Sequence, residues 1–441
     1  MSTNDALPTH PPAPADSAAP DDSRLTAARI VGQWLDSGRF PSRMMAPVAG
    51  SRAFVNEVVL GCVRWKGLLD WVIARYAARP PATPARALLM VGLYQLLRMD
   101  SVPAFAAVNE TVGAARRAGL TGATGFLNGV LRRVDRERDA LLAELARQRL
   151  TVRESHPDAL VARWVARYGQ ADAEALCRWN NQPPFVVLRV NTLKTTAPAY
   201  AEQLRAAGIE PQPAPAPAEA CWVLPHGVRV ESLPGFAEGW FSVCDPSTLR
   251  AVELTGAAPG ERVLDACAAP GGKTILLAQR MRDDGCIVAM DVSAKRAERV
   301  RENVARLGLT CVRPLVGSAA DRESIARALA DGPFDRVLLD APCTNTGTLR
   351  RRPDARWRFS AEHLATAVRR QRALLDTVAR AVKPGGTLVY STCSIEPEEN
   401  EGQVEAWLRE HPEFAEVARE SLFPPRAGTD GAFCAALKRR V

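Results

Sequence analysis

The sequence predicts a multidomain protein: an all-α domain, then a small α+β module, then a C-terminal α/β domain of Rossmann-like type. Three observations support this architecture. The chain has 441 residues, about three times the ~150 residues that one domain typically uses. Apolar residues recur at helical spacing from residue 23 to about residue 150. After residue 246, strand-like and helical segments alternate, which is typical of a parallel sheet covered by helices.

The composition is that of an ordinary folded protein. Hydrophobic residues make up 47% and charged residues 24%, which excludes a chain that is mostly disordered, collagenous or coiled coil. The longest apolar stretch, residues 87–97, is far shorter than the ~20 residues that span a bilayer. The N-terminus has no basic segment followed by an apolar run, so we find no signal peptide and expect a cytoplasmic protein.

The ten cysteines indicate neither a metal site nor a disulfide framework. No two of them form a C-x-x-C pair, and they are spread thinly along the chain. We therefore expect reduced thiols and no bound metal.

The N-terminal third of the chain has two parts. Residues 1–22 contain prolines and aspartates but no lysine, arginine or aromatic residue, so we expect a disordered tail. In residues 23–150 the pattern is helical throughout. Phe54, Val58, Cys62 and Trp65 recur at helical spacing, and short proline- or glycine-rich segments separate the helices. This part is predicted to be a compact all-α domain.

Residues 151–245 mix helical and strand-like patterns. A helix is expected around 158–179, a strand over 185–191 and another helix over 200–207. The proline-rich segment 211–217 is predicted to be a loop, and β-like sequence continues to residue 243. These elements indicate a small α+β module.

In residues 246–441 the expected elements alternate. The predicted strands are 262–267, 286–291, 336–340 and 387–392, and the predicted helices are 274–282, 294–307, 324–330 and 361–382. This alternation predicts a parallel, doubly wound sheet, and ligands of such sheets bind beyond the carboxyl ends of the strands.

A glycine-rich turn follows the first of these strands. It consists of Cys267, Ala268, Ala269, Pro270, Gly271, Gly272 and Lys273. The turn matches neither the dinucleotide nor the phosphate-loop fingerprint. Glycines in such a turn let a ligand approach the backbone, and Asp291, at the end of the next strand, suits a ribose diol. A nucleoside site and a purely structural turn are both open on this evidence.

Two cysteines follow the last two predicted strands. Asp340-Ala-Pro-Cys343 closes one strand, and Thr392-Cys393-Ser394 closes the next. Either segment alone is most simply a strand end with an inert thiol. Together they place two cysteines and an aspartate at one sheet edge beside the glycine-rich turn, which favours a catalytic site.

These motifs identify a family resemblance. Residues 246–441 resemble the methyltransferase domain of the NOL1/NOP2/Sun family of RNA cytosine-C5 methyltransferases. Residues 155–157, 188–191 and 239–245 are similar to the RNA-binding module that precedes the family's catalytic core. Residues 102–110 and 125–133 are similar to a NusB-like RNA-binding domain. The combination is typical of bacterial members that act on 16S rRNA.

The resemblance implies a mechanism and a set of site residues. Cys393 would attack C6 of the cytosine, and Cys343 would assist release of the product. Asp340 would contact the pyrimidine edge and the cofactor, and Lys273 would favour the thiolate. The cofactor, S-adenosyl-L-methionine, would be held by residues 267–273, Asp291, Ser318 and Asp340. The expected substrate is 16S rRNA, unassembled or partly assembled, and the expected protein is a monomer.

Three positions depart from the family pattern. The acid that usually follows the third strand is replaced by Ser318 in Gly317-Ser-Ala-Ala-Asp321, so either Ser318 or Asp321 takes its role. The segment after Cys343 is Thr-Asn-Thr-Gly, and no glutamine precedes Asp245. These departures bear on cofactor affinity and on the choice of nucleotide.

Basic residues also bear on the partner. The net charge of +8 is moderate, and it indicates a polyanion only where basic residues gather at a site. Five arginines surround Trp357 in residues 350–358, which predicts RNA contact, although a solvated loop is the alternative. The arginines of residues 132–138 alternate with acids and are expected to lie on a solvated helix face.

Three other functions fit parts of the sequence. The first is the same chemistry on tRNA or 23S rRNA. The second is a non-catalytic RNA-binding assembly factor on a decayed methyltransferase fold, which the presence of both Cys343 and Cys393 argues against. The third is a nicotinamide-dependent dehydrogenase, which the missing glycine fingerprint disfavours.

Overall fold

The computed structural model describes residues 23–44, 51–215, 220–225 and 227–441. The tail predicted for residues 1–22 lies outside this range. The chain divides into two compact units, Met1–Ser155 and His156–Val441. No helix in the described part of the chain is both long enough and apolar enough to cross a membrane.

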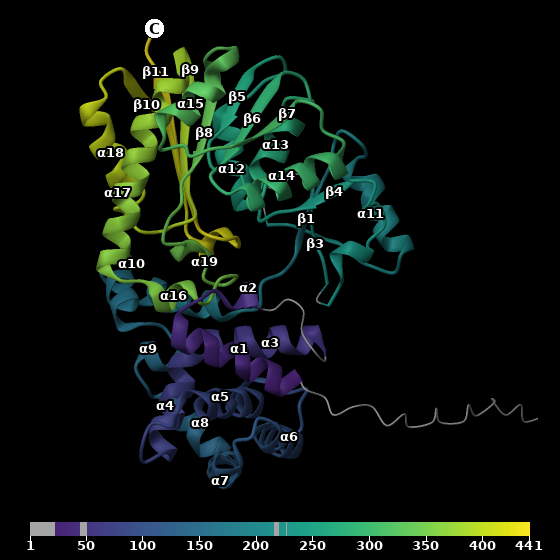
Figure 1. Cartoon of the computed structure of the whole chain (residues 1–441), viewed down its shortest axis with the longest axis vertical. Helices are drawn as coiled ribbons and strands as arrows, with labels where there is room; N and C mark the ends of the chain where they lie inside the picture. Colours follow the sequence, from purple (N-terminus) through teal and green to yellow (C-terminus); the bar gives the residue numbers. More distant parts are fainter. Residues whose placement is uncertain (1–22, 45–50, 216–219, 226) are drawn as a thin grey trace, which may run out of the picture. The chain divides into compact units, whose positions relative to one another are not determined.

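The first unit contains helices joined by short loops, and none of its described residues forms a strand (Figure 1). Its longer helices are α1 (Ser23–Ser37), α3 (Arg52–Arg64), α4 (Lys66–Tyr76), α5 (Thr83–Arg98), α6 (Ala104–Arg117), α7 (Thr124–Arg136) and α8 (Arg138–Ala146). Short helices α2 (Pro41–Met44) and α9 (Leu150–Arg153) complete it. This confirms the predicted all-α domain.

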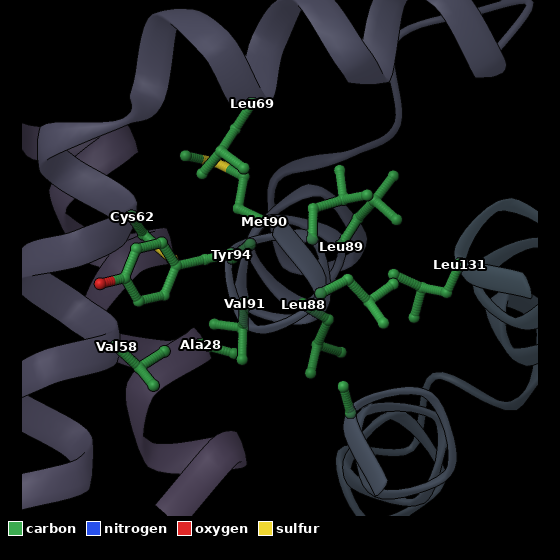
Figure 2. Packing of buried hydrophobic residues seen from close by; sticks show 14 of the residues in the cluster. Ala28, Val58, Cys62, Leu69, Leu88, Leu89, Met90, Val91, Tyr94 and Leu131 are labelled. Carbon is green, nitrogen blue, oxygen red and sulfur yellow. The ribbon is translucent and has the colours of Figure 1, made fainter. Parts of the chain in front are cut away.

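Helix α5 forms the centre of this unit because almost all of its side chains are apolar. Residues 87–97 are all buried, and Figure 2 shows side chains from several surrounding helices packed around it. The ring of Tyr94 lies on Gly61 of α3, where an added Cβ would come within 2.0 Å of the ring. The Tyr94 hydroxyl donates to Glu57 at 2.6 Å, so its polar end is satisfied.

The second unit begins with the α+β module. It contains α10 (Asp158–Asn181), β1 (Val187–Val190), α11 (Ala197–Ala206), β2 (Gln212–Pro213), β3 (Cys221–Val223) and β4 (Phe241–Val243). The strands form an antiparallel sheet in the order β2-β3-β1-β4. The predicted loop 211–217 is therefore wrong in part, because the extended backbone of Gln212 and Pro213 pairs with β3 at the sheet edge, where a proline is tolerated.

The C-terminal domain contains a seven-stranded sheet in the order β10-β11-β9-β8-β5-β6-β7. The strands are β5 (Arg262–Asp265), β6 (Cys286–Asp291), β7 (Val312–Val316), β8 (Phe334–Asp340), β9 (Val382–Thr392), β10 (Phe414–Leu422) and β11 (Ala432–Arg439). Strands β5 to β9 pair in parallel, which confirms the Rossmann-like core.

The sheet as a whole is mixed: the predicted parallel arrangement is confirmed for β5 to β9, and one edge is antiparallel. Strands β10 and β11 pair antiparallel there, and the pattern of apolar residues predicted neither them nor β7. Charged residues in β10 and the proline in β7 hide the usual apolar pattern of a strand.

The helices of this domain are α12 (Ser247–Thr255), α13 (Gly272–Arg280), α14 (Ala294–Leu307), α15 (Arg322–Ala328), α16 (Ala355–Arg358), α17 (Ala361–Val378), α18 (Glu401–Glu410) and α19 (Pro424–Ala427). The prediction for α14 is confirmed at both ends, since Ser293 caps its start and Gly308 its end. The helix predicted to reach residue 382 ends at Val378, because β9 begins at Val382.

The α+β module packs directly on the C-terminal domain. An added Cβ on Gly239 would lie 2.2 Å from the carbonyl oxygen of Arg306, so only glycine allows this approach. Arg306 donates in turn to the carbonyl oxygens of Phe236 and Phe241. These contacts fix the module against the end of α14.

Candidate active site

The glycine-rich turn lies at the point where the strand order reverses, between β5 and β8. Gly271 has φ of 104°, a conformation that favours glycine, and α13 begins at the next residue. An added Cβ on Gly272 would meet nothing within 4 Å, so the start of α13 faces open space. Its unpaired N–H groups are therefore available to a polar ligand.

Asp265 provides a test of whether a cofactor fits here. It ends β5 and is fully buried. Its Oδ2 accepts from Thr274 at 2.6 Å, whereas Oδ1 has no hydrogen-bond partner among the described residues. Burial raises the pKa of Asp265 to about 7. A polar cofactor beside the turn fits this unsatisfied acceptor.

Asp291 lies at the end of β6 and is 2% exposed. Its Oδ2 accepts from the Ala269 amide at 3.3 Å, and its Oδ1 accepts from the Ser293 amide and from Arg296. The carboxylate therefore reaches the glycine-rich turn, and Oδ2 retains capacity for a further donor such as a ribose hydroxyl.

Ser318 and Asp321 have different roles in the structure. Gly317 donates to the Asp291 carbonyl oxygen, so Ser318 lies at the same sheet edge as Asp291. Asp321 caps α15 instead, since its carboxylate accepts from the amide and the hydroxyl of Ser324. This geometry favours Ser318 over Asp321 for cofactor contact.

Lys273 and Asp340 form an ion pair at the centre of the site. Lys273 Nζ lies 2.8 Å from Asp340 Oδ2, and Ser391 donates to Asp340 Oδ1 at 2.8 Å. Burial opposes the Lys273 charge, but the Asp340 carboxylate outweighs it, and the pKa of Lys273 is raised. Lys273 therefore stays charged at neutral pH.

Cys343 and Cys393 meet beyond the ends of β8 and β9. Their sulfur atoms are 3.3 Å apart. Asn345, in a left-handed conformation, donates from Nδ2 to the Cys343 carbonyl oxygen, and its Oδ1 lies 3.3 Å from the Cys393 sulfur. The hydrogen bond to Cys393, together with burial, raises the pKa of Cys343 well above its ordinary value. Cys343 therefore keeps its proton.

Cys267 has no such thiol partner among the described residues. Burial raises its pKa to about 12, which makes it an inert thiol at neutral pH. A cavity of about 30 Å³ lies beside the active thiols instead, and Lys273, Asp340 and Cys393 all line it. The site therefore brings together three of the four residues predicted to be catalytic around one space, with Cys343 in contact with Cys393.

Glu399 is a site residue that sequence reasoning did not single out. It is fully buried and accepts hydrogen bonds from Thr344, from Ser394 and from Gln371. Thr344 follows Cys343 and Ser394 follows Cys393, so one carboxylate ties both cysteine loops together. The acid-rich segment after Cys393 was the only signal in the sequence, and it did not show which acid is buried.

The arginine-rich segment 350–358 is placed differently from the prediction. Arg350, Arg351 and Arg356 make internal contacts: with the rings of Trp179 and Phe185, with Asp245 and Asp430, and with Asn180 and Asn181. The prediction of RNA contact is wrong for these three, because Arg350 and Arg356 are buried and the charge of Arg351 is paired with two carboxylates. Arg352 remains exposed.

Comparison with known proteins agrees with this geometry. Residues 253–438 match the family described as 16S rRNA methyltransferase RsmB/F. Residues 21–136 match the NusB family, and residues 156–231 match the ferredoxin-like domain of RsmF/B-like methyltransferases. A ribosomal RNA small subunit methyltransferase B from Pseudomonas syringae pv. tomato is 39% identical over 399 residues, covering 88% of this chain and 85% of the relative.

The chain belongs to the RsmB family of 16S rRNA methyltransferases. A second relative, a probable ribosomal RNA small subunit methyltransferase B from Synechocystis, is 38% identical and covers 82% of both chains. The crystal structure of a methyltransferase homologue from Pyrococcus horikoshii is 29% identical, with a TM-score of 0.58, and covers 66% of this chain and 97% of that one. RsmB family members are S-adenosylmethionine-dependent cytosine methyltransferases, which confirms the predicted cofactor and favours 16S rRNA over tRNA and 23S rRNA.

Proposed function

We propose that this RsmB family member methylates C5 of a cytosine in 16S rRNA through a covalent bond between Cys393 and C6. The observation that carries the proposal is the thiol pair beside an ion pair: Cys343 keeps its proton next to Cys393, and Lys273 stays charged beside them. A thiol donor and a nearby cation can both stabilise negative charge on the Cys393 sulfur as its bond to C6 forms and breaks.

Cytosine C5 is a weak nucleophile until C6 is attacked. The Cys393 thiolate adds to C6, and the electron pair of the C5–C6 double bond then makes C5 nucleophilic. Asp340, held by Lys273 and Ser391, faces the same cavity and accepts a hydrogen bond from the pyrimidine's amino edge. S-adenosylmethionine supplies the methyl group.

Release of the methylated RNA requires that the bond between Cys393 and C6 breaks. After methyl transfer the C5 proton passes to water, the electrons of the C5–H bond reform the C5–C6 double bond, and the electrons of the C6–S bond return to the Cys393 sulfur. Cys343 lies where it can donate a hydrogen bond to that sulfur as its charge returns. We therefore assign Cys343 to product release and Cys393 to attack.

The cofactor role falls to the glycine-rich turn and its neighbours. Residues 267–273 would contact the cofactor, and Asp291 would bind its ribose. Ser318 and Asp340 would complete the cofactor site. The open start of α13 and the unsatisfied Asp265 oxygen support this assignment.

The target cytosine must be accessible to the active site, and this requirement limits which form of the RNA can be the substrate. A cytosine inside a duplex is unreachable, so the target must be unpaired or flipped out. We propose that the substrate is 16S rRNA before assembly is complete, which also places the protein in the cytoplasm, and that a single copy of the chain acts on it. The domains we propose are 23–150, 151–245 and 246–441.

The experiment that tests this mechanism substitutes the two cysteines one at a time. Cys393→Ala should lose methylation and form no adduct. Cys343→Ala should still attack and should accumulate a covalent protein–RNA species on a denaturing gel. An adduct in Cys393→Ala and none in Cys343→Ala would reverse the assignment. Activity in both variants without any adduct would refute covalent catalysis.

A further inference from the structure

A second cavity lies between the α+β module and the catalytic domain. Its volume is about 480 Å³, and its walls come from β1 and the residues after it, from α12 and from α13. None of the residues assigned above to attack, release or cofactor binding lines it. The lining residues that matter here are Arg189, Val252, Leu276, Gln279 and Arg280.

Gln279 is the unusual member of this lining. It is 7% exposed, and neither the oxygen nor the nitrogen of its amide has a hydrogen-bond partner among the described residues. Burying an unsatisfied amide costs free energy, so such groups normally have a partner. A ligand that offers both a donor and an acceptor would satisfy it.

The other walls define what kind of ligand fits. Arg189 and Arg280 contribute positive charge, and Arg280 is exposed and makes no ion pair within the described chain. One acid, Glu253, also lines the cavity, but its carboxylate is paired with Arg250 at 2.8 Å, so the two arginines leave the wall with a net positive charge. Val252 and Leu276 contribute buried apolar surface. Two cations, an apolar wall and a free amide match the phosphate, the flat face and the hydrogen-bonding edge of a nucleotide.

We propose that this cavity binds one nucleotide of the RNA substrate, close in sequence to the cytosine that is methylated. Its phosphate lies toward Arg189 and Arg280, and its base edge pairs with the Gln279 amide. This inference rests on the proposed function and adds a site that reads the sequence around the target.

The position of the cavity supports a neighbouring nucleotide. Lys273, in the catalytic cavity, and Arg280, in this one, lie on the same helix and seven residues apart. At 1.5 Å per residue the separation along α13 is about 10 Å. That corresponds to about three nucleotides at the ~3.4 Å spacing of stacked bases. Helix α12 also contributes residues to both cavities.

The first test replaces the amide by an apolar group of similar size. Gln279→Met should weaken binding of a 16S rRNA transcript about tenfold, which is the size expected for losing a base-edge contact. S-adenosylmethionine affinity should not change, and the melting temperature should not fall. Unchanged RNA affinity would overturn the proposal whatever the melting temperature, since the amide would then have no RNA ligand.

The second test uses matched charge reversals. Arg280→Glu should weaken RNA binding and lower the salt dependence of the affinity, because fewer counterions are released. Arg282→Glu changes the same charge two residues away, outside the cavity lining, and should have the smaller effect. Equal effects of the two reversals would overturn the proposal. Both arginines are exposed, so this test stands even if Gln279→Met fails to fold.

A third measurement separates RNA from free nucleotides. The four ribonucleoside 5′-monophosphates are titrated into the wild type and Gln279→Met, and each is tested as a competitor of RNA. Gln279-dependent binding of a monophosphate that competes with RNA supports the proposal, whereas such binding without competition overturns it. If the wild type methylates 16S rRNA and Cys393→Ala does not, the proposed function stands whatever these variants show.

Discussion

The sulfur atoms of Cys343 and Cys393 lie 3.3 Å apart although 50 residues separate them in the chain. The parallel pairing of β8 with β9, which sets Asp340 opposite Ser391, brings the two loops to the same edge. Gly347 allows the two loops to approach each other, since an added Cβ there would lie 2.8 Å from the Cys393 carbonyl oxygen. The thiol pair therefore depends on the packing of two loops, and changes in that packing should affect activity.

Glu399 is expected to control that packing. Glu399→Gln turns one acceptor oxygen into an N–H₂ that can only donate. The hydrogen bonds that Thr344, Ser394 and Gln371 donate to the carboxylate then lose their charged acceptor, which costs ~1–3 kcal/mol of stability. The turnover number should fall strongly while S-adenosylmethionine affinity stays near the wild-type value, as measured by methylation kinetics and calorimetry.

The matched control is Glu398→Gln. Glu398 is adjacent in sequence, but its side chain is 45% exposed and pairs with Arg163 at the surface. This variant should keep its activity. Equal losses in the two variants would show that Glu399 has no special role in holding the cysteine loops.

Ser318 and Asp321 can be separated by their different contacts. Ser318→Ala should weaken S-adenosylmethionine binding by several-fold, because Ser318 lies beside Asp291 at the sheet edge. Asp321→Ala should lower the melting temperature by removing the cap of α15 and should leave cofactor affinity unchanged. Calorimetry and thermal unfolding distinguish the two, and the opposite pattern would assign the cofactor contact to Asp321.

The catalytic edge was predictable because its signals are local. The glycine-rich turn, Asp340 and the two cysteines each follow an apolar strand, and the rule that parallel strands meet at their carboxyl ends places them together. Helix α14 was predicted at both ends because its caps, Ser293 and Gly308, are adjacent to it in sequence.

Long-range charge pairing was not predictable in the same way. Arg351 reaches Asp245 and Asp430, which are 106 and 79 residues away. Nothing near Arg351 in the sequence distinguishes a buried ion pair from an RNA contact. Strand β10 was missed for a related reason, since its charged residues are tolerated only because it lies at the sheet edge.

The correction for the arginine-rich segment has a measurable consequence. Arg351→Glu removes the cation between two buried carboxylates and should destabilise the protein by ~3–5 kcal/mol, the cost typical of breaking a buried ion pair. Arg352→Glu, at an exposed neighbour, should destabilise the protein less than Arg351→Glu, because water screens the charge of an exposed side chain. Thermal unfolding measures both. Equal melting temperatures of the two variants would show that Arg351 contributes no more to stability than an exposed arginine, and would favour the predicted RNA contact instead.

Asp265 should make stability depend on pH, and the sign follows from its raised pKa. Burial raises this pKa to about 7 in the folded protein, whereas an unfolded aspartate titrates near ~3.9. Between these values the unfolded chain has lost the proton that the folded chain keeps, so stability falls as pH rises from about 4 to about 7. Each tenfold difference in proton affinity corresponds to about 1.4 kcal/mol, so this residue alone accounts for up to about 4 kcal/mol.

Asp265→Asn isolates this effect, because asparagine keeps an oxygen for Thr274 and does not titrate. Asp430, whose pKa burial also raises to about 7, contributes to the wild-type curve in the same range and stays in the variant. The melting temperature of the wild type should therefore fall relative to Asp265→Asn between pH 4 and pH 7, with no further divergence above. Parallel curves would show that Asp265 is ionised in the folded protein, and that its unpaired oxygen carries a charge which the cofactor site must then compensate.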